Sequence, residues 1–268
     1  SGWSLTGNSL YETTDFQPSG NYTYYGISLN NTSGTGYQLT GNYIGGRDSL
    51  CTGNALSMGV AGTLRTLIFN PVFINVGTGA TTTLQGNVVR NVALRSSSTT
   101  PFFGIRIDNG LVQATSNAVG DTLGTGSIQL TGTVTNAISY GMYVDGNTTG
   151  QVASNRIGAI TTANTSSSNA HDVYALYTNS SGSTLSLTGN YIGSETTASS
   201  IHATGTATSN SQRVFGLYVA GTGTYLIDGN RIANLTNATT ETNQASKTYG
   251  LYVTNGATRI TNNTIHDL

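Results

Sequence analysis

Two acidic residues occupy matching places in neighbouring copies of a repeated phrase, and they could hold a cation or share a proton. Asp108 follows the letters GIRI and Asp145 follows GMYV, so each lies four positions after a glycine. Paired carboxylates serve in acid–base catalysis on sugars, and carboxylate oxygens are also ligands for calcium. The alternative is that both side chains close turns at strand ends, as Asn30 and Asn179 would at the same position. We expect no basic partner and no third carboxylate there, so we predict no catalytic residue.

Tyrosines form the second group with useful chemistry. Each copy of the repeated phrase opens with one residue, such as Gly104 or Gly141, from which positions are counted here. The side chains two positions after it are expected to point outward, and they are Ser28, Asn75, Arg106, Tyr143, Tyr177, Tyr218 and Tyr252. Sugars stack on aromatic faces, and a neighbouring column of glycine or alanine would form a trough where a polymer approaches the backbone. Tyr143, Tyr177, Tyr218 and Tyr252 are therefore the candidate glycan-binding residues. The alternative is that they only pack within a parallel sheet or lie under the spacers.

The remaining reactive side chains follow no pattern of a site. His171, His202 and His266 share no column and lack the spacing of metal ligands, so we expect them in solvent. Cys51, the one cysteine, is expected to be a small, partly buried apolar residue. No cofactor is predicted, and the one open alternative is a Ca²⁺ ion at Asp108 and Asp145.

These residues belong to a sequence repeat, the phrase named above, which occurs seven times along the chain. Its opening residues are Gly26, Phe73, Gly104, Gly141, Ala175, Gly216 and Gly250, and its closing residues are Asn42, Asn87, Asn117, Asn155, Asn190, Asn230 and Asn263. An eighth closing half stands alone at residues 3–10, with Asn8 in the equivalent place. A constant core joined by spacers of variable length is typical of a stacked repeat.

Apolar residues alternate with period two inside each phrase, which predicts short strands. In TGN, QGN, TSN and DGN a glycine or small residue precedes the closing asparagine and suits a bend with positive φ. Equivalent residues recur in the same direction, so neighbouring phrases should pair in parallel. We therefore predict an all-β fold, a right-handed parallel β-helix (β-solenoid) of about seven coils with long polar loops from one corner. The asparagine column would stack at about 4.8 Å per rung and bond coil to coil.

The longest spacer, residues 47–70, departs from this polar pattern. Leu64, Leu67 and Ile68 have helical spacing, so we expect a small lobe packed on the solenoid.

The repeated GLYV and LTGNYIG motifs resemble those of the pectin-lyase-like right-handed β-helix repeats of large secreted bacterial surface proteins, particularly those of Bacteroidetes-type bacteria. The resemblance covers almost the whole chain, but such motifs are shared by proteins with many functions. It implies an extracellular or cell-surface location. Ser49 in DSL and Thr122 in DTL also resemble O-glycosylation acceptors of these bacteria, so both are candidate modification sites.

Composition excludes several classes of function. The chain has 268 residues, 8% of them charged, and a net charge of −1, so a basic nucleic-acid surface is excluded. No apolar run is long enough for a transmembrane helix. We treat residues 1–268 as one β-helix repeat region, and as a segment of a longer solenoid because the phrase begins and ends in the same phase.

These observations favour a structural or adhesive extracellular module, a stalk or fibre segment, over an enzyme. The expected partners are further copies of the repeat, or of the chain itself end to end, and surface glycans. The alternative is a carbohydrate-binding or polysaccharide-degrading β-helix domain, either a polysaccharide lyase or a glycoside hydrolase. An enzyme would show clustered carboxylates in a cleft, whereas a stalk would show uniform polar corners.

Overall fold

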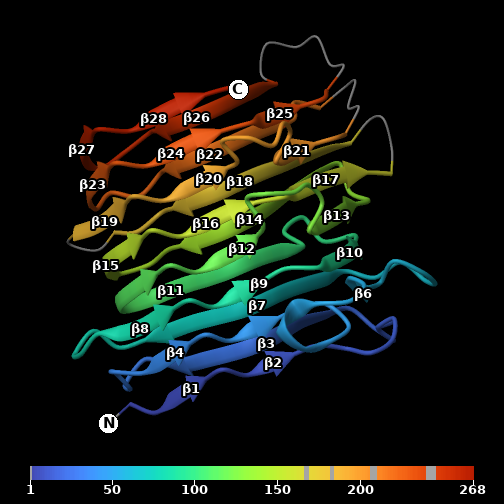
Figure 1. Ribbon diagram of the computed structural model, residues 1–268, viewed down its shortest axis with the longest axis horizontal. Helices are drawn as coiled ribbons and strands as arrows, with labels where there is room; N and C mark the ends of the chain where they lie inside the picture. Colours follow the sequence, from blue (N-terminus) through green and yellow to red (C-terminus); the bar gives the residue numbers. More distant parts are fainter. Residues whose placement is uncertain (1, 166–168, 182–183, 206–209, 240–245) are drawn as a thin grey trace.

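The computed structural model describes residues 2–165, 169–181, 184–205, 210–239 and 246–268. In these residues the fold is all-β, and the one helical segment is a 3-10 turn, η1 (Ser49–Cys51). The strands pair in parallel and stack in sequence order from the N-terminal end to the C-terminal end (Figure 1). The predicted all-β class and parallel pairing are confirmed.

The strands form three parallel sheets of 14, 8 and 6 strands. The 14-stranded sheet has two ladders that share the long strand β11 (Phe102–Thr115). The first ladder also contains β3 (Tyr22–Asn31), β7 (Leu67–Val76), β14 (Asn136–Val144), β18 (Ala170–Thr178), β22 (Arg213–Val219) and β26 (Lys247–Val253). The second also contains β1 (Ser4–Thr6), β4 (Gln38–Thr40), β8 (Thr82–Gln85), β15 (Thr148–Ala153), β19 (Thr184–Thr188), β23 (Thr224–Asp228) and β27 (Ala257–Thr261).

The other two sheets consist of shorter strands. The 8-stranded sheet contains β2 (Ser9–Leu10), β5 (Tyr43–Ile44), β9 (Val88–Val89), β12 (Ala118–Gly120), β16 (Arg156–Gly158), β20 (Tyr191–Gly193), β24 (Arg231–Ala233) and β28 (Thr264–His266). The 6-stranded sheet contains β6 (Leu56–Met58), β10 (Val92–Ser96), β13 (Ile128–Gly132), β17 (Ile160–Asn164), β21 (Ile201–Ala203) and β25 (Leu235–Asn237). The chain passes through the sheets in a fixed order, as from β14 through β15, β16 and β17 to β18, which is compatible with a parallel β-solenoid.

The 6-stranded sheet corrects the prediction that the spacers are only polar loops from one corner. Most spacers contribute a strand to this sheet, with buried apolar residues such as Val92 and Leu94. The strands escape sequence analysis because their position within the spacer varies. Only residues 90 and 91 separate β9 from β10, whereas residues 121–127 separate β12 from β13. The lobe predicted over residues 47–70 is also wrong in part, because Leu67 and Ile68 belong to β7 rather than to a helix.

The second phrase has a different register from the one predicted. Phe73 pairs with Ser28 on one side and Arg106 on the other, so Phe73, not Asn75, stands two positions after the opening residue. The opening residue of this phrase is Pro71. The shift is invisible in the apolar pattern because Val72, Ile74 and Val76 alternate in either register.

The asparagine column forms the predicted ladder. In every rung the side-chain Nδ2 donates to Oδ1 of the next asparagine, at 2.9–3.0 Å, over Asn8, Asn42, Asn87, Asn117, Asn155, Asn190, Asn230 and Asn263. The residue before the asparagine adopts positive φ, as in Gly41 (60°) and Ser154 (54°). This bend turns the amide inward, where the six inner asparagines are at most 1% exposed.

The core is a continuous apolar column inside the sheets. Residues one and three positions after the opening residue, such as Ile105 and Ile107, are buried, as are Leu187 and Ile192 around the asparagine ladder. Ile260 and Ile265 in the last strands have a neighbouring strand on one side and are 48% and 40% exposed. The predicted inward columns are thus confirmed in the inner rungs.

Candidate functional site

Two aromatic columns run side by side on the outer face of the first ladder of the 14-stranded sheet. One column lies two positions after the opening residue and contains Tyr143, Tyr177, Tyr218 and Tyr252. The other lies one position before it and contains Phe103, Tyr140, Tyr174, Phe215 and Tyr249. We call these nine residues the aromatic strip. It crosses β11, β14, β18, β22 and β26, which lie next to one another in Figure 1.

A bend at the opening residue places both columns on the same face. The pairing between strands skips this residue, so that Phe103 pairs with Tyr140 and Ile105 with Met142 while Gly104 is passed over. A Cβ on Gly104 would lie 2.5 Å from the carbonyl oxygen of Gly141 and 2.6 Å from a side-chain carbon of Val119. The opening glycine therefore faces the interior. The predicted outer trough of glycine and alanine is wrong, and the opening position instead holds the strand bend.

The rings of the strip are in contact along the stack. Tyr143 and Tyr177 stack with centroids 5.3 Å apart, and Tyr177 meets Tyr218 edge-on at 5.3 Å. Within one strand, Tyr249 and Tyr252 have centroids 4.6 Å apart. These separations lie in the range where aromatic pairs attract one another beyond their burial.

The two columns differ in exposure. Phe103, Tyr174 and Phe215 are buried, at 6%, 5% and 2%, whereas Tyr143, Tyr177, Tyr218 and Tyr252 are half-buried. These three buried residues thus form the inner layer of the strip, whereas Tyr140 and Tyr249 of the same column are half-buried, as are the four tyrosines of the other column. The tyrosines therefore pack against neighbours and also keep part of each ring in contact with solvent.

Four tyrosines of the strip have a raised pKa, which favours the protonated phenol. Burial raises the pKa of Tyr140, Tyr174 and Tyr177 above the ordinary value. Burial also raises the pKa of Tyr143, and its hydroxyl donates to Oδ2 of Asp145 at 2.7 Å, which adds to the shift. These four tyrosines therefore combine apolar ring surface with neutral hydroxyl donors.

Arg106 extends the strip toward the N-terminus. Its guanidinium lies 4.9 Å from the ring centroid of Phe103, 5.4 Å from that of Phe73 and 5.7 Å from that of Tyr143. It also binds Asp108 with two nitrogens, at 2.8 and 2.9 Å. The expectation that this corner has no basic partner is wrong, because Arg106 and Asp108 lie two positions apart on one strand and point to the same face.

The two candidate carboxylates are each held by neighbours on the ladder. Asp108 is paired with Arg106, while Asp145 accepts from Tyr143 and from Nδ2 of Asn179 at 3.0 Å. Among the described residues, no group of three or more His, Cys, Asp or Glu residues could hold a metal ion. A calcium ion at Asp108 and Asp145 remains a prediction.

His171 corrects the expectation of three solvated histidines. Its ring is completely buried, Nε2 is 2.9 Å from the Ser139 hydroxyl, and Nδ1 is 3.0 Å from the carbonyl oxygen of Ala163. Burial lowers its pKa to about 4. Because a substrate cannot reach these groups, we interpret His171 as a structural residue. Nε2 joins β18 to β14 within the first ladder, and Nδ1 joins β18 to β17 of the 6-stranded sheet.

The other candidate residues lie in loops or beside the sheets. Ser49 is exposed in η1, and its backbone N–H binds the Asp48 side chain at 2.7 Å. Thr122 is half-buried in the loop after β12. Cys51 is buried, and burial raises the pKa of its thiol to about 11, as expected of an unreactive residue.

Sequence analysis missed the inner aromatic column although its signal is present. An aromatic residue directly precedes the opening residue in FFG, SYG, VYA, VFG and TYG. If side chains alternated strictly between the two faces of the strand, this aromatic residue would point to the interior. The bend at the opening residue turns it outward instead.

Comparison with protein-family models, with curated proteins and with solved structures finds no match to this chain. None of the helices in the described residues has the length and apolar character needed to span a membrane.

Proposed function

We propose that the chain is a right-handed parallel β-helix of about seven coils that serves as a structural and adhesive module of an extracellular surface protein. The observation that carries the proposal is the aromatic strip, which holds half-buried tyrosines in register on successive rungs. Polymers with flat apolar faces, such as neutral polysaccharides, match such an array because each rung offers an equivalent ring. The extracellular location rests on the sequence resemblance alone.

The scaffold supports this role because every rung is tied to the next in the same way. The ladder amides and the apolar columns repeat without a break from Asn42 to Asn230, so the positions of the tyrosines are set by a uniform stack. The binding surface is thus preorganised, which reduces the entropy lost when a long ligand docks. The proposal includes further copies of the repeat as neighbours, since exposed strands with apolar residues such as Ile260 and Ile265 are suited to pairing.

Retardation in gels that contain soluble polysaccharides tests the adhesive role. We expect at least one neutral β-glucan or mannan to retard the chain, and the double variant Tyr177→Ala with Tyr218→Ala to migrate freely. The matched control is Tyr11→Ala with Tyr22→Ala, because these residues are 42% and 54% exposed but lie outside the strip. Binding that survives the strip substitutions would leave the strip with a packing role only.

A polysaccharide-degrading enzyme is the second candidate. The observation in its favour is that Asp108 lies within β11 and Asp145 directly follows β14, two strands that carry the strip, and Asp145 binds a strip tyrosine directly. Depolymerisation of several polysaccharides, with calcium present, would be assayed with the wild type, Asp108→Asn and Asp145→Asn. Activity that both substitutions abolish would favour the enzyme over the structural module.

A further inference from the structure

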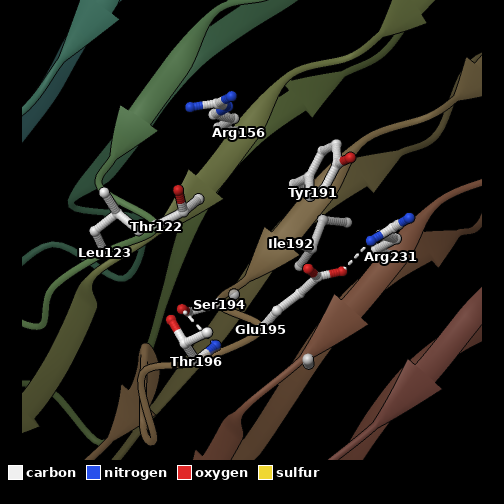
Figure 2. Close-up of a pocket in the computed structure, with 11 residues that line it drawn as sticks. Thr122, Leu123, Arg156, Tyr191, Ile192, Ser194, Glu195, Thr196 and Arg231 are labelled. Atoms are coloured by element: carbon white, nitrogen blue, oxygen red, sulfur yellow. Dashed lines mark hydrogen bonds and ion pairs between the residues drawn. The ribbon is translucent and has the colours of Figure 1, made fainter.

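A second candidate site lies on another face of the molecule, over the 8-stranded sheet. A hollow of about 260 Å³ is bordered by strands β16, β20 and β24, by the loop that carries Thr122 and Leu123, and by residues 194–196 (Figure 2). This volume is slightly below that of pockets for drug-sized ligands, so it suits a unit the size of one sugar ring.

An Arg–Tyr–Arg column forms one wall of this hollow. Arg156 pairs with Tyr191 and Tyr191 pairs with Arg231, so the three side chains stand on consecutive rungs about 4.8 Å apart (Figure 2). The guanidinium of Arg231 lies 5.5 Å from the ring centroid of Tyr191 and covers one face of the ring. Tyr191 is nevertheless 39% exposed. No other aromatic ring or cation of the described residues lies over it.

The two arginines of the hollow differ in whether a carboxylate neutralises their charge. Arg231 forms an ion pair with Glu195, and both side chains are about half exposed. Arg156 is exposed and forms no ion pair within the part of the chain that the structure describes. The column therefore has one unneutralised cation, while Glu195 retains oxygen lone pairs that can accept from hydroxyl groups.

Apolar surface completes the site. Leu123 is 79% exposed on the loop opposite the column and supplies this surface, whereas Ile192 of strand β20, also at the hollow, is 1% exposed and belongs to the core (Figure 2). A ring that enters between Leu123 and Tyr191 would contact apolar atoms on both sides. Its anionic substituent would meet Arg156, whose planar guanidinium binds a carboxylate or sulfate through two parallel hydrogen bonds.

We propose that this hollow binds a single saccharide unit that bears one anionic group, a carboxylate or a sulfate. Tyr191 stacks on the sugar ring, Arg156 binds the anion, and Glu195 accepts from ring hydroxyls. The site is separate from the aromatic strip, and it does not depend on the function proposed for the strip. Thr122 borders it, so a glycan attached to Thr122 would restrict access.

Solution NMR of the full chain labelled at tyrosine rings tests the proposal with four probes: methyl glucuronide, glucose 6-sulfate, uncharged methyl glucoside and a tetraglutamate peptide. We expect one or both anionic sugars to shift the Tyr191 signals, and which of them does so identifies the preferred anion. Arg156→Gln should weaken this binding roughly tenfold, which corresponds to about 1.4 kcal/mol. Tyr191→Phe should retain binding and Tyr191→Ala should lose it. Arg259→Gln, an equal charge change at an exposed residue of another sheet, should have no effect.

Four results would overturn the proposal. Failure of both anionic sugars to shift Tyr191 would remove the site. Equal binding of methyl glucoside would show that the anion is not recognised, and equal binding of tetraglutamate would show that the sugar ring is not. Equal losses in Arg156→Gln and Arg259→Gln would indicate only general attraction by charge. The folding of each variant is checked by circular dichroism. We expect Arg156→Gln to fold like the wild type because the Arg156 side chain is exposed.

Discussion

Each inner asparagine of the ladder satisfies several buried polar groups at once. Oδ1 of Asn190 accepts from the backbone N–H and from Nδ2 of Asn155, both at 3.0 Å, while its own Nδ2 donates to the carbonyl oxygen of Val152 and to Asn230. Asn190 is completely buried. Water therefore cannot replace these bonds. Removing one ladder side chain would leave its buried partners without a hydrogen bond, and the loss of stability grows with the number of such groups.

We expect Asn190→Ala to lower the free energy of unfolding by about 3 kcal/mol, because buried groups of Asn155 and Val152 lose their partner. Urea unfolding followed by circular dichroism measures the change. The matched control is Asn147→Ala, an exposed asparagine, which should cost less than about 0.5 kcal/mol. Equal costs for the two substitutions would show that the ladder amides contribute no more than surface ones.

His171 should make the stability of the fold depend on pH. Its folded-state pKa of about 4 lies below the ordinary 6.5, so the neutral ring stabilises the fold fully above about pH 6.5. This contribution is lost as the pH falls from about 6.5 to about 4, because the unfolded chain takes up a proton first. The loss reaches about 3 kcal/mol.

The comparison with His171→Asn isolates this effect, since Asp172 titrates in both proteins and cancels in the difference, while Arg213 stays protonated throughout. We expect the stability gap between wild type and variant to be largest near neutral pH and to shrink by about 2 kcal/mol by about pH 4.5. Urea unfolding at several pH values measures it. A gap that is constant with pH would mean that His171 is protonated equally in the folded and unfolded chain.

At the scale of the strand, the bend at the opening residue decides which side chains face outward. A Cβ on Gly216 would lie 2.5 Å from the carbonyl oxygen of Gly250 and 2.5 Å from a side-chain carbon of Ile232. Because Ala175 occupies the same position one rung away, a methyl group can be housed there if its neighbours move. The bend therefore tolerates a small residue at the cost of strain.

We predict that Gly216→Ala destabilises the chain by about 2 kcal/mol. Gly124→Ala is the control, because a Cβ at this loop position meets no heavy atom within 4 Å, and its effect should stay below about 0.5 kcal/mol. Thermal unfolding of the two variants makes the comparison. Equal melting temperatures would place the opening glycine in open space and remove the physical reason for the bend.

The strands inside the repeated phrase and the asparagine ladder could be predicted because they follow from residues that recur at constant spacing, unlike the strands of the 6-stranded sheet, whose position in the spacers varies. The inner aromatic column could not be predicted, because the bend at the opening residue interrupts the alternation with period two. No single residue type marks this bend, since Pro71 and Ala175 occupy the position where other phrases have glycine. The register at Phe73 was missed for a related reason, because Val72, Ile74 and Val76 satisfy the apolar pattern in two registers. The pairing of Arg106 with Asp108 depends on side-chain conformation, which spacing alone does not fix.

At the scale of the whole molecule, the stack converts a short phrase into long continuous features. The ladder and the apolar column run through the interior, and the aromatic strip runs along one outer face of the same rungs. The Arg–Tyr–Arg column lies on a different sheet, so the two candidate sites can be altered separately. This separation allows one face to be tested while the other serves as an internal reference.

The central claim is that the tyrosines of the strip contact neutral glycans, and ring signals of labelled tyrosine report this contact directly. In a titration with linear neutral oligosaccharides of glucose and mannose, we predict shifts at Tyr177 and Tyr218. The buried Tyr37 and Tyr225 should remain unchanged, as should Tyr191 in the second site. Replacing Tyr177 and Tyr218 by alanine should weaken binding by roughly tenfold or more. Absence of shifts with every oligosaccharide, or shifts confined to tyrosines outside the strip, would contradict the claim.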